Sequence, residues 1–150
     1  MRADRAYRVE LLIRALAFCL VLILGLSVAV TPTWAEDVER YIEEGLAHYT
    51  EGQFDLAIAS FQGAIRLKPD FWLPHYSLAL AYDKKGQYDA AISSFKEAIR
   101  LKPDNASAHE ALGITYFHAG NRGKALEEYK ILKELDQDKA KKLFDKISKD

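Results

Sequence analysis

Apolar residues recur along most of this chain at the three- and four-residue spacing that places them on one face of an α-helix. The stretch from Leu78 to Lys85 follows this spacing and stops at Gly86, and a second apolar series runs from Tyr88 to Leu101. Glycine takes the left-handed conformation that ends a helix without steric cost, and Pro103 prevents the second helix from continuing. The middle of the chain therefore predicts two short helices joined by a tight turn.

The same two-helix pattern returns with a period of 34 residues. Residues 64–70 recur unchanged as 98–104, and residues 52–55 return as 86–89 with one aromatic residue exchanged for another. A helical hairpin cannot bury its own apolar face, so neighbouring copies stack into a solenoid. We expect three copies, the last more divergent, at residues 38–71, 72–105 and 106–139.

Small residues recur at the places where two helices would cross. They are Gly45, Ala79 and Gly113 on the first helices and Ala57, Ala91 and Ala125 on the second helices. Small side chains let two helix backbones approach closely, and larger side chains fill the space beside the crossing. The large residues expected there are Phe61, Phe95 and Tyr129.

The spacing of these positions resembles the tetratricopeptide repeat family. The middle copy meets the family pattern at Leu78, Ala79, Tyr82, Gly86, Tyr88, Ala91, Phe95, Ala98 and Pro103. The resemblance covers about residues 38–139. It implies an all-α fold, a right-handed α-solenoid of three helix-turn-helix repeats. It also implies that the first helix of each repeat lines a concave groove in which a protein or peptide binds.

The third copy departs from this pattern, as a terminal repeat with a neighbour on one side only is expected to do. Arg122 stands in place of the aromatic residue, Leu132 in place of the alanine and Gln137 in place of the proline. Residues 138–148 then predict a capping helix with lysines facing solvent. Its residues expected to pack on the last repeat are Leu143, Phe144 and Ile147.

The resemblance also assigns groove positions on the three first helices. Carried onto this chain, they are Ile42, Leu46, Tyr49, Leu73, Tyr76, Leu80, Asp83, Glu110, Ile114, Phe117 and His118. Some family members clamp a C-terminal carboxylate with Lys and Asn at such places, where this chain has Tyr76, Leu80, Glu110 and Ile114. We therefore expect a protein or peptide partner other than a chaperone with a carboxylate tail. The alternative is that the capping helix, or packing within the helices, covers part of this stripe.

Trp72 is a second candidate contact for a partner. It lies between Phe71 and Leu73 in the predicted turn between two repeats, and Trp is enriched among the residues that dominate binding energies. The other interpretation is that Trp72 packs over the repeat junction. We favour packing, because a contiguous exposed apolar patch is unusual without a function.

The first 35 residues differ in composition from the rest of the chain. Four arginines precede an uncharged, Leu-rich run over residues 15–30, and Thr33 and Ala35 offer small residues at the cleavage positions. This order is typical of a secretory signal peptide. We expect residues 1–35 to be removed after Ala35 and the mature protein to be exported, to the periplasm or outside the cell.

An uncleaved membrane anchor over about residues 11–30 is the alternative. As a helix, the uncharged run would be about 24 Å long, shorter than the bilayer core of about 30 Å. Extending the helix back to Leu11 would place Arg14 within the span. Association with a membrane is therefore expected only if the leader is retained.

Composition narrows the functional classes. Hydrophobic residues make up 49% of the chain and charged residues 29%, which fits a globular protein. The net charge of −1 provides no basic field for nucleic acid, so we expect no nucleic-acid partner. Removal of the leader would take away the single cysteine, leaving no disulfide or thiol chemistry.

Candidate catalytic motifs are incomplete. His109 and Glu110 begin like the helix of a zinc protease, but Gly113 stands where the second histidine belongs. His75 and His109 occupy equivalent places in successive repeats and lack a third ligand at a suitable spacing. We therefore favour histidines that fill the pocket of a large aromatic residue over a shared metal site, and we expect no metal and no cofactor.

Taken together, these patterns predict a non-enzymatic adaptor or scaffold that binds a protein or peptide in the cell envelope or outside the cell. Two alternatives stay open. One is a structural subunit that associates with itself through the ends of the solenoid. The other is an assembly factor tethered to a membrane by its N-terminal segment.

Overall fold

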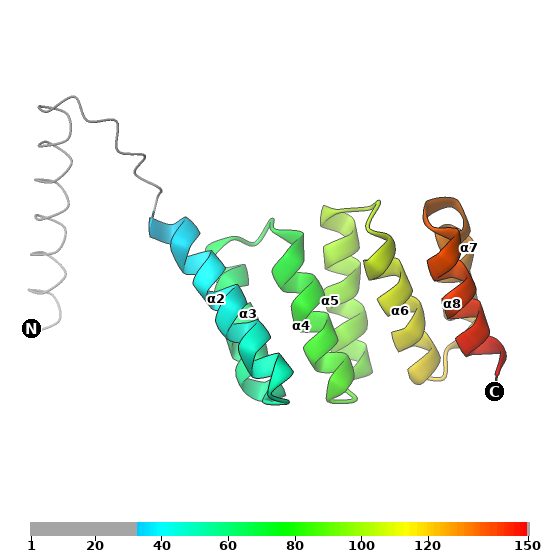
Figure 1. Ribbon diagram of the computed structural model, residues 1–150, viewed down its shortest axis with the longest axis horizontal. Coiled ribbons are helices and arrows are strands. Elements are labelled where there is room, and N and C mark those ends of the chain that lie inside the picture. Colours follow the sequence, from blue (N-terminus) through cyan, green and yellow to red (C-terminus); the bar gives the residue numbers. More distant parts are fainter. Residues whose placement is uncertain (1–32, 150) are drawn as a thin grey trace, which may run out of the picture. The chain divides into compact units, whose positions relative to one another are not determined.

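The computed structural model describes residues 33–149. The predicted signal segment up to residue 32, and with it the alternative anchor over residues 11–30, lies outside the described residues. The described part forms seven α-helices, shown in Figure 1: α2 (Thr33–Thr50), α3 (Phe54–Leu67), α4 (Trp72–Lys84), α5 (Tyr88–Leu101), α6 (Ala106–His118), α7 (Arg122–Leu135) and α8 (Gln137–Ser148).

These helices pack as successive hairpins. Helix α2 pairs with α3, α4 with α5 and α6 with α7, and each hairpin packs against the next through the first helix of the later one. The first helices α2, α4 and α6 also touch one another in turn, and α8 packs on both α6 and α7. The all-helical repeat architecture expected from the sequence is thus confirmed for residues 33–149.

A glycine ends each first helix. Gly52, Gly86 and Gly120 have φ angles of 76°, 73° and 76°, in the left-handed region that glycine adopts without strain. At the middle turn, the Gln87 N–H donates to the Tyr82 carbonyl at 2.9 Å, which satisfies a carbonyl that the end of α4 leaves unpaired. The three-residue turns of the hairpins follow directly from this geometry.

The helices cross closely at the small residues, as expected. Ala57, Ala91 and Ala125 are fully buried, as are Phe61 and Phe95 beside them. The glycines on the first helices are equally constrained, because a Cβ at Gly45 would lie 2.5 Å from the Phe61 ring. Tyr129 is only partly buried, and its ring centroid lies 5.2 Å from that of Phe144 on α8.

The connections between repeats differ at the C-terminal end. Four residues link α3 to α4 and α5 to α6, and each link contains a proline. Asp136 alone separates α7 from α8, and its carboxylate accepts a hydrogen bond from the Lys139 N–H at 3.0 Å, which caps α8. Because Gln137 stands where Pro69 and Pro103 stand in the earlier copies, nothing prevents α8 from starting at once.

Helix α8 buries one face against the last repeat. Leu143 and Ile147 are 0% and 1% exposed, whereas Phe144 touches Tyr129 and stays 44% exposed. At the other end, α2 begins at Thr33, so the expected cleavage after Ala35 falls within its first turn. Among the helices of residues 33–149, none combines the length and the hydropathy that crossing a bilayer requires.

Candidate functional site

The groove residues expected from the sequence lie on the first helices α2, α4 and α6, which contact one another in succession. We call the side of these helices that carries the following groove residues the inner face: Tyr49, Tyr76, Leu80, Asp83, Glu110, Ile114, Phe117 and His118.

Asp83 links α4 to α6 on this face. Its carboxylate accepts a hydrogen bond from the Thr115 hydroxyl at 2.9 Å and lies 3.5 Å from His118 Nδ1. The Asp83 side chain is 18% exposed and that of His118 is 33% exposed. The Asp83 charge is thus partly compensated within the protein, and the two helices are held in register by polar contacts.

The aromatic residues of the inner face share one electrostatic environment. Burial raises the pKa of the Tyr76 hydroxyl, and the negative charge of Glu110 raises it further. Burial likewise raises the pKa of Tyr49, with Asp83 as the second cause. The structure therefore brings Tyr49, Tyr76, Asp83 and Glu110, from three different helices, onto one surface. Both tyrosines stay neutral at physiological pH and present a hydroxyl and a ring.

Apolar side chains on α4 and α6 make up the rest of the inner face. Leu80, Ile114 and Phe117 are each partly buried against the main core and keep part of their surface open. Tyr76 packs edge-on against the buried Phe95 ring, with ring centroids 5.8 Å apart. These residues therefore contribute to the core as well as to the surface.

The N-terminal groove candidates are divided between core and solvent. Ile42 is only 7% exposed and packs in a cluster with Val38 and Ala64, against which Leu73 also packs. We therefore assign Ile42 to the core, because little of it remains for a partner to contact. Leu46, by contrast, is 46% exposed.

Trp72 is half-buried at the start of α4. Its ring centroid lies 6.1 Å from that of Tyr76, and Lys102 Nζ lies 4.9 Å from the indole ring. A cation above an aromatic face is attracted by the ring quadrupole. Trp72 thus packs within the second copy, between α4 and the link that follows α5, and stays partly exposed.

The capping helix reaches the inner face at Glu110 and Phe117, as the alternative interpretation of the groove stripe allowed. Lys139 Nζ lies 3.9 Å from the Glu110 carboxylate. Phe117 forms one wall of a pocket of about 440 Å³ whose other lining residues come from α8 and the residue after it: Lys142, Asp145, Lys146 and Lys149. The spacing of these lysines marks one helix face in the sequence, but only the docking of α8 places that face against Phe117.

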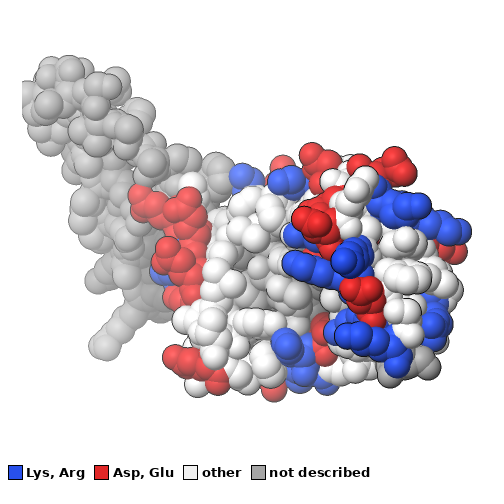
Figure 2. Space-filling view, turned by 45° about the vertical axis from the view of Figure 1, so that its right-hand side comes forward, with Lys and Arg blue, Asp and Glu red and all other residues white. Residues whose placement is uncertain are grey.

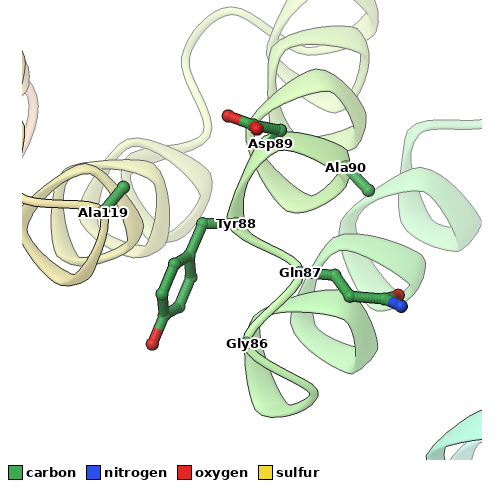
Figure 3. A pocket seen from close by; sticks show the side chains of 6 residues that line it. All are labelled: Gly86, Gln87, Tyr88, Asp89, Ala90 and Ala119. Atoms are coloured by element: carbon green, nitrogen blue, oxygen red, sulfur yellow. The ribbon is translucent and has the colours of Figure 1, made fainter.

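A second, open pocket of about 590 Å³ lies at the turn between α4 and α5. Figure 3 shows Tyr88 directed toward α6 and Ala119, Asp89 at the start of α5, and Gln87 turned to the opposite side. The Tyr88 ring centroid lies 5.9 Å from that of His118, which connects this pocket to the inner face. The pocket contains one carboxylate and brings together no acid–base pair.

The two repeated histidines are held by backbone carbonyls. His75 Nε2 lies 2.8 Å from the Pro69 carbonyl, and His109 Nε2 lies 3.0 Å from the Pro103 carbonyl. His109 Nδ1 is also 2.7 Å from the Glu128 carboxylate. Both partners of His109 accept hydrogen bonds, so the geometry suits the protonated ring, and the Glu128 contact raises the pKa of His109. Within residues 33–149, no three potential ligands approach closely enough to hold a metal ion.

Comparisons with known proteins agree with this architecture. The family model of the TPR repeat matches residues 45–86 and 84–120, which together span half of the 150 residues. The chain belongs to the tetratricopeptide repeat family. A comparison with curated protein sequences gave no significant match.

Solved TPR structures share the fold. The second TPR domain of human RPAP3, in complex with an HSP70 peptide, superimposes with a TM-score of 0.73 at 21% identity, over 78% of this chain and 99% of that chain. The Arabidopsis OM64 TPR domain gives 0.71 at 20% identity, over 76% and 96% of the two chains. The crystal structure of MamA gives 0.64 at 32% identity over 69% of this chain, and our chain spans 61% of the MamA chain.

Proposed function

We propose that this TPR protein is a non-enzymatic adaptor that binds a protein segment or peptide on its inner face, in the cell envelope or outside the cell. The observation that carries the proposal is the inner face itself. Tyr76, Leu80, Ile114 and Phe117 come from two adjacent helices and keep apolar surface open after packing on the core. Aromatic side chains supply a large contact area and have little rotamer entropy to lose.

The similarity to solved complexes supports the same proposal. The TPR domains of RPAP3 and of yeast Sti1 were solved with HSP70 or HSP90 peptides. The inner face of this chain has Tyr76, Leu80, Glu110 and Ile114 in place of the Lys and Asn that suit a carboxylate tail. Glu110 would repel such a tail. We therefore propose a partner segment that differs from these chaperone peptides.

The test combines Tyr76→Ala with Phe117→Ala and measures binding to an array of terminally blocked peptides. We expect the double variant to weaken binding of the selected peptides by about 2 kcal/mol or more, on the scale of hot-spot truncations. Leu56→Ala is the matched control, because Leu56 is 51% exposed on α3 and lies outside the inner face. Unchanged binding together with a strongly lowered melting temperature would show that these residues are core and would move the site toward Trp72.

The proposed location has its own test. Exported protein should begin at Glu36 when its N-terminus is sequenced, because the arginines, the apolar run and Ala35 follow the order that is typical of a cleaved signal peptide. Recovery of protein that retains Met1 in the membrane fraction would contradict cleavage and favour the anchored alternative.

A further inference from the structure

Charge is distributed unevenly along the solenoid. Helix α2 contains five carboxylates and one arginine, whereas α8 with the following Lys149 contains five lysines and two aspartates. In Figure 2, most blue side chains lie on the C-terminal side, with red ones among them, whereas the N-terminal side is mainly red. Although the net charge of the chain is near zero, its C-terminal end is basic and would attract a negatively charged partner.

The basic end includes a cavity. Lys142, Lys146 and Lys149 follow one face of α8 at helical spacing and line the pocket against Phe117. Among residues 33–149, none of these three ammonium groups has a carboxylate within 4.0 Å, whereas Lys139 on the same helix approaches Glu110 and Asp136. Asp145 is the single acidic residue that lines the pocket. The lysines at the rim are thus available to a ligand from outside.

The chemistry of the pocket specifies the ligand. Phe117 and three lysines line the pocket, and a lysine side chain offers an apolar methylene stem as well as a charged ammonium group. A volume of about 440 Å³ has room for one or two side chains. The complementary ligand has an apolar side chain flanked by carboxylates. Ions held at such a rim gain from charge complementarity without being fully buried.

We propose that the inner face selects acidic partner segments, with an apolar side chain of the partner against Phe117 and neighbouring side-chain carboxylates on Lys142 and Lys146. This inference rests on the proposed peptide-binding function and names the class of peptide. The carboxylates belong to Asp or Glu side chains within the segment, so the segment needs no free C-terminus. This arrangement fixes the orientation of the bound segment: its acidic part lies toward α8, and the rest extends over α6 and α4.

The experiment uses the array of terminally blocked peptides and one defined probe, a blocked fluorescent peptide with a central Phe flanked by glutamates. Variants combine Lys142→Glu with Lys146→Glu. The matched control combines Lys141→Glu on α8 with Lys133→Glu on α7, two positions outside the pocket. It changes the net charge of the protein by the same amount as the pocket variant. We expect the pocket variant to weaken probe binding by at least about tenfold and the control by much less. The probe with glutamine in place of glutamate should bind the parent protein weakly.

The outcomes separate the two proposals. Enrichment of acidic peptides on the array, lost in the pocket variant and kept in the control, supports the inference. Bound peptides without acidic preference would leave the adaptor function standing and overturn the acidic specificity. Equal losses in both variants would assign the effect to net charge and also overturn it. If the lysines instead bound a second copy of this chain, sedimentation would show an oligomer of the parent protein and a monomer of the pocket variant, and the probe would not bind.

Discussion

Gly113→Ala tests how closely α8 packs on the last repeat. A Cβ at Gly113 would lie 2.5 Å from Leu143 Cδ2 and 3.2 Å from Glu128 Cβ. Ordinary carbon–carbon contacts are about 3.5–4.0 Å, so the Leu143 side chain would have to move by about 1 Å in a site where it is fully buried. Overpacking of this kind costs about 1–3 kcal/mol. Alanine also stabilises a helix relative to glycine by about 1 kcal/mol. The net expectation is a loss of about 0–2 kcal/mol in the free energy of unfolding.

Gly123→Ala is the matched control. Gly123 lies in the first turn of α7, and its new Cβ would meet only Asn121 Oδ1, at 3.9 Å. Without a clash, the substitution should stabilise the protein by about 0.5–1 kcal/mol. Urea denaturation followed by helical circular dichroism would measure both variants. If Gly113→Ala stabilised the protein as much as Gly123→Ala, Leu143 would not be packed beside Gly113, and the close contact of α8 with α6 would be wrong.

Two further predictions concern the core. Ala91→Leu should lower the free energy of unfolding by about 1–3 kcal/mol, because Ala91 is fully buried at the crossing of α4 and α5; a denaturation midpoint equal to that of the parent would contradict this crossing. The hydrogen bond with Glu128 raises the pKa of His109. This pair therefore contributes stability that is present below the ordinary pKa of 6.5 and is lost as the pH rises through the raised value. The free energy of unfolding should differ more between the parent and Glu128→Gln at about pH 6 than at about pH 9; an equal difference at both would show that His109 is neutral throughout.

Much of the fold could be predicted because the residues that determine it recur in successive copies of the repeat. The alanine at the crossing, the glycine at the turn and the proline after the second helix recur at a fixed spacing, and the structure uses each in the expected way. Helix capping is equally local, since the Asn105 side-chain oxygen accepts a hydrogen bond from the Ala108 N–H at 3.3 Å and caps α6. Local signals of this kind depend on neighbours within one turn of the helix, which the sequence displays directly.

For the inner face, the sequence could predict which positions belong to it but not which of their side chains contact one another. The resemblance identified Asp83 and His118 as groove positions, but the hydrogen bond between Asp83 and Thr115 joins residues 32 positions apart. The 34-residue period gives no information on which side chains meet across two repeats that differ in sequence. Ile42 shows the converse, because its position suggested a groove residue and its surroundings bury it. Exposure depends on neighbouring helices, and α2 has different neighbours from α4 and α6.

Helix α8 explains why the C-terminal end combines capping with a charged pocket. It packs on α6 and α7 as α4 packs on α2 and α3, so it takes the place of the first helix of a further repeat. The described chain adds no second helix to cover its other side, which accounts for the exposure of Phe144. A first helix also contributes to the inner face, and α8 does so with lysines instead of the apolar residues of α4 and α6. The two roles use different faces of one helix. Truncating Leu143 should therefore lower stability and distort the pocket together, whereas reversing Lys146 should change binding and leave the melting temperature nearly unaltered.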